Sequence, residues 1–169
     1  MKADRVVLGI GGNENNTREL FSGFRNILTG FGLKELNFSG IYATAPFMGA
    51  NQNPYLNFCC TYLWSGPSAK LLEFTQSLET ALGRPPKREK WSDRGIDIDI
   101  LLHGERKVNA PDLIIPHYQL AVRDFFLIPA LQILPGLTIP GLAETPAELL
   151  RRIPAELRTA PAETEADWA

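Results

Sequence analysis

Residues 96–102, "IDIDILL", restrict the fold more than any other segment, because apolar residues and acids alternate along them. Successive side chains of a β-strand point to opposite faces. A strand here has one apolar face, made by Ile96, Ile98, Ile100 and Leu102. Its other face carries two acids and a leucine, namely Asp97, Asp99 and Leu101. We expect the apolar face to pack against the core and the carboxylates to project from an open face of a sheet.

The segments before this strand have strand and helix patterns in turn. Residues 5–10, 34–47 and 55–64 are typical of strands, and residues 16–32 and 66–83 have apolar residues at helical spacing. The order β-α-β-β-α-β predicts an α+β fold with a ferredoxin-like core, in which two helices pack on one face of an antiparallel sheet. The less regular, proline-rich chain that follows predicts C-terminal additions to that core.

Individual residues predict where these elements begin and end. The alternation of the second strand runs through Leu36, Phe38, Gly40 and Tyr42 and stops at Pro46. Asn16 or Thr17 can cap the first helix, and Gly83 ends the second. Residues 145–148, "TPAE", match the start of a short helix with a capping box. We expect residues 155–169 to be a loose tail.

The chain of 169 residues is long enough for one domain, residues 1–169, and its formal net charge of −2 does not favour a nucleic-acid partner. The start, "MKADRVVLGI", has no apolar run long enough for a signal peptide or a membrane span. Cys59 and Cys60 are neighbours that point to opposite faces of a strand, which argues against a disulfide. We therefore expect a cytoplasmic protein with no membrane partner. We expect a monomer, with a homodimer left open.

The acid pair and the loop before it suggest chemistry. Asp97 and Asp99 would lie about 7 Å apart along the strand, and carboxylate oxygens suit Mg²⁺. Five cations precede them, namely Arg84, Lys87, Arg88, Lys90 and Arg94. Metal-bound polyphosphate needs both features, since acids hold the metal and cations neutralise the phosphates. The plainer alternatives are a solvated sheet face for the acid pair and a solvated or nucleic-acid-binding patch for the loop. The alternative for the loop leaves the adjacent acids unexplained.

Other candidates are weak when taken alone. "GIGGN" at residues 9–13 lies between a strand and a helix and suits close approach of a ligand, although a tight turn is the simpler explanation. Tyr55 and Asn57 share a strand face and can stack on and hydrogen-bond a flat heterocycle, or be ordinary surface residues. Gln76 and Glu79 are more typical of a solvated helix flank.

Seven short motifs follow one another along the chain, namely "GIGGN", "IYATAPFMG", "YLN", "FTQSLETALGR", "KWSDRGIDIDILL", "IPHY" and "RDF". In this order, over roughly residues 5–140, the chain resembles the 6-hydroxymethyl-7,8-dihydropterin pyrophosphokinases of folate biosynthesis. The segment around "RGIDIDI" is highly specific for that family. The resemblance implies a ferredoxin-like fold and an enzyme that transfers a pyrophosphoryl group from ATP to the pterin hydroxymethyl group and releases AMP.

The resemblance also implies roles for the matching residues. Asp97 and Asp99 would bind two Mg²⁺ ions, with ATP as co-substrate, and Arg84 and Arg94 would be catalytic. The residues that would hold the pterin, or close over it, are Thr44, Ala45, Phe47 or Met48, Tyr55, Asn57, Trp91 and Phe125. The residues in or beside the ATP site would be Gln76, Glu79, Lys87, Ile100, His117, Tyr118 and Arg123. No general base is required if Mg²⁺ acidifies the hydroxyl group.

The chain departs from the family pattern without losing a metal ligand or a catalytic arginine. The departures are Gly12 for a usual serine, Ala45 for a usual proline, Pro85 and Pro86 for a basic residue, and Asp93 in the catalytic loop. We therefore expect an active enzyme.

Two other functions are compatible with parts of the pattern. A Mg²⁺-dependent nucleotide phosphohydrolase would use the same acids and arginines but would not need Tyr55 and Asn57. A ferredoxin-like nucleotide- or RNA-binding module would use a basic, aromatic sheet face. The acids at 97 and 99 argue against that module, because without a metal they repel phosphate.

Overall fold

The computed structural model describes residues 2–44, 53–84, 95–154 and 159–163. Within these residues, a six-stranded sheet has the strand order β5-β1-β4-β3-β8, and β2 also pairs with β4. The strands are β1 (Asp4–Gly12), β2 (Asn37–Phe38), β3 (Ile41–Thr44), β4 (Tyr55–Trp64), β5 (Asp97–His103) and β8 (Ala160–Glu163). All the strand pairs described in this sheet are antiparallel.

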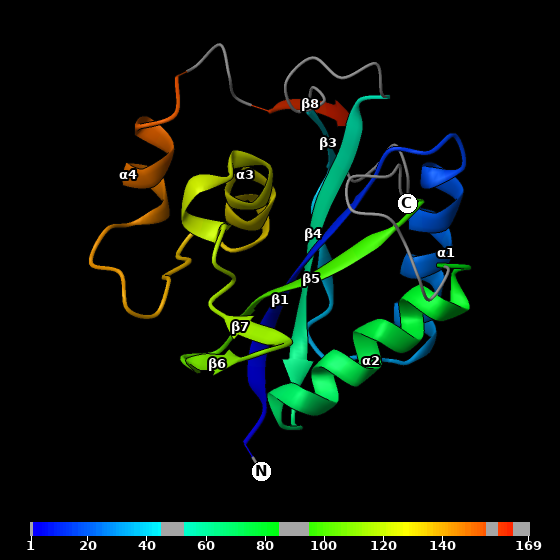
Figure 1. Ribbon diagram of the computed structural model, residues 1–169, viewed down its shortest axis with the longest axis horizontal. Helices are drawn as coiled ribbons and strands as arrows, with labels where there is room; N and C mark the ends of the chain where they lie inside the picture. The colour runs from blue at the N-terminus through cyan, green and yellow to red at the C-terminus, as the bar shows by residue number, and fades with distance from the viewer. Residues whose placement is uncertain (1, 45–52, 85–94, 155–158, 164–169) are drawn as a thin grey trace.

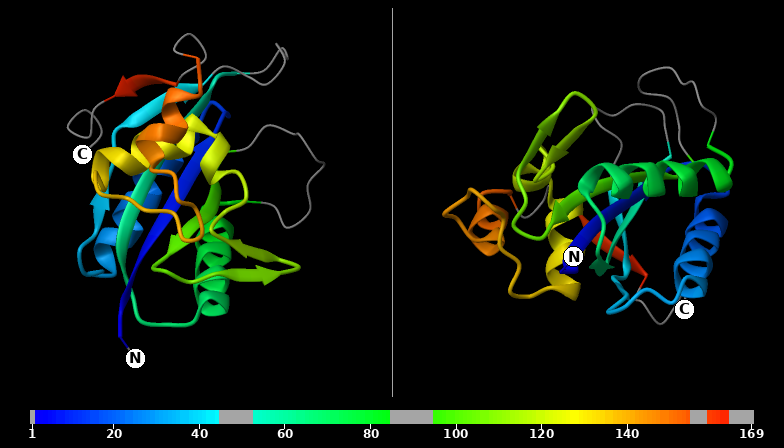
Figure 2. Two further views of the ribbon diagram at one scale, coloured as in Figure 1. Left: turned by 90° about the vertical axis from the view of Figure 1, so that its left-hand side faces the viewer. Right: turned by 90° about the horizontal axis from the view of Figure 1, so that it is seen from below.

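Helices lie on both faces of the sheet (Figures 1 and 2). The first two helices, α1 (Thr17–Gly30) and α2 (Ser68–Ala81), cover one face, as the sequence predicts. The C-terminal additions lie on the other side: the hairpin β6 (Val108–Ala110) and β7 (Leu113–Ile115), the 3-10 turn η2 (Leu120–Val122), α3 (Asp124–Ile133) and α4 (Pro146–Arg151). None of the described helices is long and apolar enough to cross a membrane.

Each face of the sheet has its own apolar core. The core under α1 and α2 includes Leu8, Ile10, Phe21, Phe24, Phe58, Leu71, Ile96, Ile98 and Ile100. The core under α3 includes Val7, Cys59, Leu101, Leu102, Phe126 and Leu127. The predicted burial of the three isoleucines against the helices is thus confirmed.

The prediction for Leu102 is wrong, because it packs in the core under α3 together with Leu101. The pairing of β1 with β5 shifts register between Val7 and Leu8, where Val7 faces Leu102 and Leu8 faces Ile100. This β-bulge breaks the two-residue alternation after Ile100.

The single strand predicted for residues 34–47 is interrupted. It forms β2 and β3 with a break at Ser39 and Gly40, where Ser39 Oγ accepts a hydrogen bond from the Cys59 N–H at 2.9 Å. The break shifts the alternation, so Phe38 and Ile41 both pack in the core under the helices. Tyr42 therefore does not share a face with Phe38, and the predicted alternation fails at this point.

Other local predictions have mixed outcomes. Asn16 precedes α1 but makes no side-chain capping hydrogen bond. Thr145 and Glu148 form the predicted capping box at the start of α4. Cys59 and Cys60 are buried free thiols in different cores. In the tail that was expected to be loose, residues 160–163 instead form the edge strand β8.

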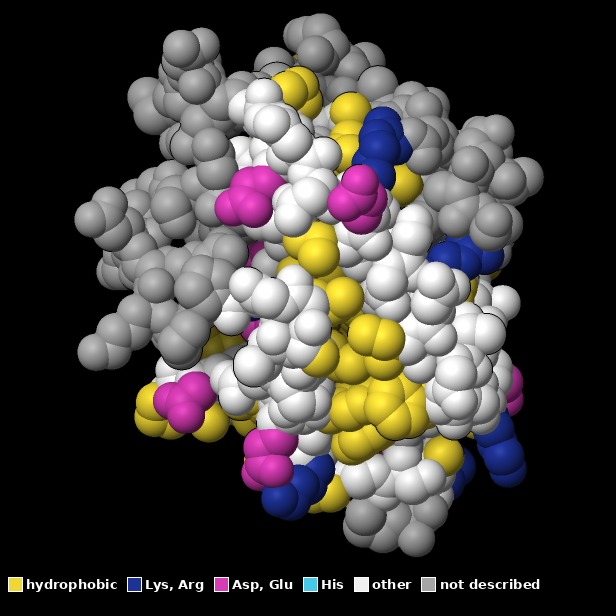
Figure 3. All heavy atoms as spheres, turned by 90° about the vertical axis from the view of Figure 1, so that its right-hand side faces the viewer, with side chains coloured by type: hydrophobic (Ala, Val, Ile, Leu, Met, Phe, Trp, Pro, Cys, Tyr) yellow, Lys and Arg dark blue, Asp and Glu magenta, His cyan; other side chains and the backbone are white. Residues whose placement is uncertain are grey.

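Figure 3 views the molecule from the side of α1 and α2, where apolar side chains gather at the surface. Phe31, which follows α1, is 59% exposed and packs edge-on against Phe74 of α2, with ring centroids 5.5 Å apart. Phe74 in turn stacks on Trp64 at 5.4 Å. These rings join the two helices to the end of β4.

Candidate active site

A row of residues across the sheet joins the predicted metal ligands to the predicted pterin residues. Gly11 of β1 lies opposite Asp97 of β5 on one side and opposite Asn57 of β4 on the other. Neighbouring strands are about 4.8 Å apart, so the backbones at Asp97 and Asn57 are about 10 Å apart. Because Gly11 has no side chain, nothing from β1 fills the space between them. The strand β1 continues to Gly12, so the tight turn considered for "GIGGN" is wrong for these glycines.

The end of α2 explains how Arg84 reaches this row. Gly83 has a φ of +86°, and its N–H donates to the Thr80 carbonyl at 3.0 Å. The Arg84 N–H donates to the Glu79 carbonyl at 2.9 Å. This pair of bonds is a Schellman motif, which needs a left-handed residue such as glycine after the helix. It turns the chain so that Arg84 lies back over the last turn of α2.

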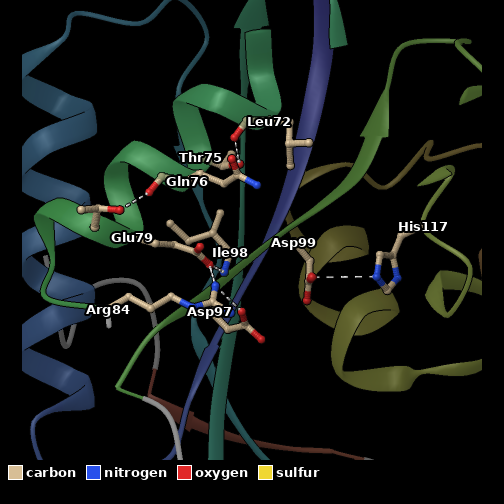
Figure 4. A network of polar contacts seen from close by, with 10 residues as sticks. Leu72, Thr75, Gln76, Glu79, Arg84, Asp97, Ile98, Asp99 and His117 are labelled. Atoms are coloured by element: carbon tan, nitrogen blue, oxygen red, sulfur yellow. Dashed lines mark hydrogen bonds and ion pairs between the residues drawn. The ribbon is translucent and has the colours of Figure 1, made fainter. Parts of the chain in front are cut away.

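The Arg84 guanidinium forms ion pairs with two acids (Figure 4). Its Nη1 atom is 2.7 Å from Asp97 Oδ1 and also bonds Glu79 Oε1. The Arg84 side chain is 27% exposed and that of Asp97 is 20% exposed. Arg84 and Asp97 therefore lie side by side at the start of β5.

Glu79 is not the solvated flank residue that its helix position suggests. Its side chain is 10% exposed, and its Oε1 atom accepts a hydrogen bond from the Ile98 N–H at 2.8 Å. Burial raises the pKa of Glu79, although the Ile98 N–H and the Arg84 cation both act in the opposite direction. Glu79 thus fastens α2 to β5 directly beside Asp97.

Asp99 lies on the same face of β5 and is more open to solvent. Its side chain is 39% exposed, and its Oδ1 atom is 3.9 Å from His117 Nε2. Burial lowers the pKa of His117, with the Asp97 carboxylate partly opposing the shift. His117 Nδ1 accepts a hydrogen bond from the Gln119 N–H at 3.3 Å, so a neutral ring carries its proton on Nε2, the atom that faces Asp99.

Thr44 and Asn57 are joined on the other side of the Gly11 row. Asn57 is 6% exposed, and its side-chain amide donates to Thr44 Oγ1 at 2.9 Å. Tyr55, at the start of β4, is half-buried and lies opposite Thr44 in the strand pairing. The amide of Asn57 is therefore held in place by β3 rather than left as an ordinary surface group.

The aromatic side chains of α3 cover part of the sheet face that carries Asp97 and Asp99. A Cβ atom on Gly9 would lie 2.8 Å from the Phe126 ring, so α3 packs directly on β1 there. Phe125 packs edge-on against Phe126, with centroids 4.7 Å apart, and the Arg123 guanidinium lies 5.8 Å from the Phe125 ring. The face is thus covered at Gly9, where Phe126 packs, and left free of a β1 side chain at Gly11.

The remaining predicted residues fall into three groups. Gln76 on α2 and Tyr118 before η2 are exposed, and the Tyr118 ring packs against that of His117 with centroids 4.8 Å apart. Ile100 has its side chain in the core under α1 and α2, on the face opposite to the two acids. The predicted residues that lie outside the described part of the chain are Ala45, Phe47, Met48, Lys87, Trp91 and Arg94.

Phe126 is a site residue that the sequence does not single out, and Gly11 is singled out only as part of the segment "GIGGN". Gly11 lies in the site because its strand pairs with β4 at Asn57 and with β5 at Asp97. Phe126 follows a predicted pterin residue, Phe125, and none of the sequence motifs includes it. A signal did exist for Gly11, since a glycine inside a strand often marks close approach of a ligand or a backbone.

The carboxylates of Asp97 and Asp99 fit a Mg²⁺ site that is completed by a substrate. Within the described residues, no group of three or more His, Cys, Asp and Glu side chains is arranged to hold a metal ion. Mg²⁺ is commonly bound through one or two carboxylates, with substrate phosphates and water as the other ligands. Two hard oxygen donors on one exposed strand face match that pattern.

Curated proteins of known name are similar to this chain over most of its length. A 2-amino-4-hydroxy-6-hydroxymethyldihydropteridine pyrophosphokinase of Methylorubrum extorquens is 32% identical over 150 residues, covering 88% of this chain and 93% of the relative. The protein of the same name from Porphyromonas gingivalis is 34% identical over 135 residues, covering 78% of this chain and 92% of the relative. A folate synthesis bifunctional protein of Arabidopsis thaliana is 28% identical over 131 residues, covering 78% of this chain and 27% of the relative.

The fold is also similar to that of solved structures. The wild-type HPPK-DHPS of Plasmodium falciparum superposes with a TM-score of 0.68 at 14% identity, covering 89% of this chain and 45% of the other. An HPPK-DHPS crystallised with substrates gives a TM-score of 0.70 at 13% identity, covering 90% and 43%. This chain spans less than half of those longer chains, and at such low identity the likeness concerns the fold alone.

A family model gives the match that decides the assignment. The model for 7,8-dihydro-6-hydroxymethylpterin-pyrophosphokinase (HPPK) matches residues 7–135, which is most of the chain. That range contains Gly11, Asn57 and Asp97 and therefore the whole Gly11 row. The chain belongs to the 7,8-dihydro-6-hydroxymethylpterin-pyrophosphokinase family.

Proposed function

We propose that this protein transfers a pyrophosphoryl group from ATP to 6-hydroxymethyl-7,8-dihydropterin in folate biosynthesis, giving the pterin diphosphate and AMP. The observation that carries the proposal is the Gly11 row, which places a carboxylate-arginine cluster and a fixed side-chain amide on either side of a residue that has no side chain. A phosphate-bearing substrate fits the first group and a flat heterocycle fits the second. The family and the named relatives support the same reaction.

Phosphoryl transfer depends on alignment of the two substrates and neutralisation of phosphate charge rather than on covalent catalysis. The residues of the site can provide both. The pterin hydroxyl oxygen attacks the β-phosphorus of ATP and loses its proton to solvent, while the bond from that phosphorus to the bridging oxygen breaks and AMP leaves with this oxygen. Arg84 neutralises charge that develops on the transferred group. Asn57, held by Thr44, hydrogen-bonds the pterin edge, and Phe125 packs on the ring.

Asp97 and Asp99 would hold Mg²⁺ against the ATP phosphates. A bound Mg²⁺ neutralises phosphate charge and lowers the pKa of a hydroxyl group near it. Asp97 already bonds Arg84, so this residue can join the metal to the arginine. The predicted roles of Arg94, Trp91 and Lys87 concern residues outside the described part of the chain and stay predictions.

We also infer that the core has the ferredoxin-like arrangement. The element order β1-α1-β2/β3-β4-α2-β5 supports this inference, and so does the strand order, in which β5 and β4 flank β1 and β4 lies beside β2 and β3. The position of α1 and α2 on one face agrees with it.

Product analysis tests the reaction. The protein is incubated with ATP, Mg²⁺ and 6-hydroxymethyl-7,8-dihydropterin, and AMP is measured. AMP should form only when the pterin is present. AMP formed equally without the pterin would instead indicate the nucleotide phosphohydrolase, and no AMP at all would reject the proposed transfer.

Two variants and a control assign the reaction to the acid pair. Asp97→Ala and Asp99→Ala should each abolish most Mg²⁺-dependent turnover. Glu73→Gln is the control, because it removes an exposed carboxylate that pairs only with Lys70 on the surface of α2 among the contacts described. Wild-type rates in both aspartate variants would mean that the pair is a solvated sheet face.

A further inference from the structure

The C-terminal segment contacts the two elements that border the expected pterin site. The strand β8 pairs antiparallel with β3, and Ala160 lies opposite Ala43, the residue before Thr44. One residue before β8, the main-chain N–H of Thr159 donates a hydrogen bond to Asp124 Oδ2. Residues 159–163 are thus bonded to β3 and to the start of α3 at the same time.

The bond between Thr159 and Asp124 is buried. Each residue is 8% exposed. A hydrogen bond to an ionised carboxylate is roughly twice as strong as one between neutral groups, and burial keeps water from competing for it. Asp124 lies between Arg123 and Phe125, two residues that the family resemblance places at the substrates. The position of the start of α3 therefore depends on the C-terminal segment.

The opposite end of α3 is fixed to the same strand by a different contact. Gln132 Oε1 accepts hydrogen bonds from the Gly40 N–H at 2.9 Å and from the Tyr42 hydroxyl at 3.0 Å. The helix α3 is thus held along β3 at both ends, by Gln132 at its C-terminal end and by residues 159–163 at its N-terminal end. Removal of the second contact would leave α3 fixed at the end that lies away from the substrates.

We propose that residues 159–163 are a positioning segment, which holds β3 and the start of α3 at a fixed separation for pterin binding. The inference rests on the proposed function. The segment lies beyond residues 7–135, the range that the family model matches. The position of β8 beside β3 at the edge of the described sheet is compatible with Pro161, because proline within a sheet is largely confined to edge strands.

The effect should be confined to one side of the site. In the sheet order, β3, β4 and β1 separate β8 from β5, which carries Asp97 and Asp99. Loss of residues 159–163 should therefore weaken binding of the pterin much more than it lowers kcat at saturating pterin. Misplacement of binding groups by about 1 Å is enough to change rates by up to ~10²-fold, and we expect the Kd for the pterin to rise about tenfold or more.

Two truncated chains form a matched pair for the test. One chain ends at residue 158 and lacks the segment, and the other ends at residue 163 and keeps it. Thr159→Pro removes the N–H that bonds Asp124, whereas Thr159→Ala keeps it, so these two variants form a second pair. Pterin affinity is measured by fluorescence titration with 6-hydroxymethylpterin and MgADP, kcat by AMP release, and folding by circular dichroism.

The expected result is a loss of pterin affinity in the chain ending at 158 and in Thr159→Pro, with affinity kept in the two controls and kcat little changed. Equal affinity in both truncated chains overturns the proposal. Parallel loss of affinity, kcat and thermal stability also overturns it, because that result indicates general destabilisation.

Hydrogen exchange separates this inference from the proposed function. If the full chain binds no pterin, the proposed function is wrong, and the amides of residues 41–44 still report on the positioning segment. They should exchange faster in the chain ending at 158 than in the chain ending at 163. Unchanged exchange overturns the positioning role whatever the enzyme does.

Discussion

Replacement of Glu79 by glutamine and by alanine separates two contributions of its carboxylate. One oxygen accepts the buried Ile98 N–H and also bonds Arg84. Glutamine keeps an oxygen that can accept the N–H but removes the charge. Alanine removes both, and the N–H is left without a partner next to Asp97.

The structure sets the size of each effect. A buried N–H without a partner costs about 1–3 kcal/mol. The ion pair with Arg84 is worth at most about 1 kcal/mol, because Arg84 is 27% exposed and solvent screens the pair. The free energy of unfolding should therefore fall by about 1–4 kcal/mol in Glu79→Ala. In Glu79→Gln it should fall by about 1 kcal/mol or less, because the loss of the ion pair is offset by relief from burying a charge.

Urea unfolding at pH 7 measures both variants against the wild type. The result that refutes the reasoning is an equal loss of stability in the two variants, since the charge and not the hydrogen-bond acceptor would then hold α2 to β5. Glu73→Gln, on the exposed side of the same helix, should change the free energy of unfolding little.

The pH dependence of the difference between wild type and Glu79→Gln gives a second check. Burial raises the pKa of Glu79, so the folded protein binds this proton more tightly than the unfolded chain does. The resulting stabilisation is complete below the ordinary glutamate pKa of ~4.3 and is lost as the pH rises through the raised pKa. The stability of wild type relative to Glu79→Gln should fall across this window and then level off. A relative stability that increases with pH would contradict the stated cause.

Three further predictions concern residues outside this network. Gly12→Ala should destabilise the fold by about 1–3 kcal/mol, because the new Cβ atom would lie 2.3 Å from the Gly95 carbonyl oxygen. The control in the same urea assay is Gly30→Ala, whose new Cβ atom would have no atom within 4 Å. Thr145→Ala should cost about 1 kcal/mol through loss of the capping box of α4, and Thr145→Ser should restore it. Burial raises the thiol pKa of Cys59 and of Cys60, so a thiol reagent should label both quickly in urea but slowly in the native protein, and fast native labelling would show that β4 is exposed.

The alternation of acids and isoleucines predicts the face of Asp97, Asp99, Ile96, Ile98 and Ile100 correctly, because each strand residue obeys a local rule. It fails at Leu102, where the bulge is set by the pairing with Val7 and Leu8 on a distant strand. The same limit applies at Ser39, whose hydroxyl oxygen bonds the main chain of Cys59 and interrupts a strand that is continuous by pattern.

Glu79 is the clearest case in which a local pattern gives the wrong environment. Its spacing from Gln76 on the helix is compatible with a solvated flank, and Gln76 is indeed exposed. Glu79 is buried because the start of β5 passes over it and presents the Ile98 N–H. Only the resemblance to a family placed it near the site, since helical periodicity carries no information about which strand packs against which turn.

The glycines of β1 extend this reasoning to the site itself. Gly9 and Gly11 are two residues apart on one strand and lie on the same face, and a different side chain occupies the space above each of them. The Phe126 ring fills the space above Gly9, so this glycine allows α3 to pack directly on β1. A Cβ atom on Gly11 would lie 3.0 Å from Asn57 Oδ1, so this glycine makes room for the Asn57 side chain. Both outcomes depend on partners far along the chain, and for that reason the segment "GIGGN" alone predicted no more than a turn or a weak ligand contact.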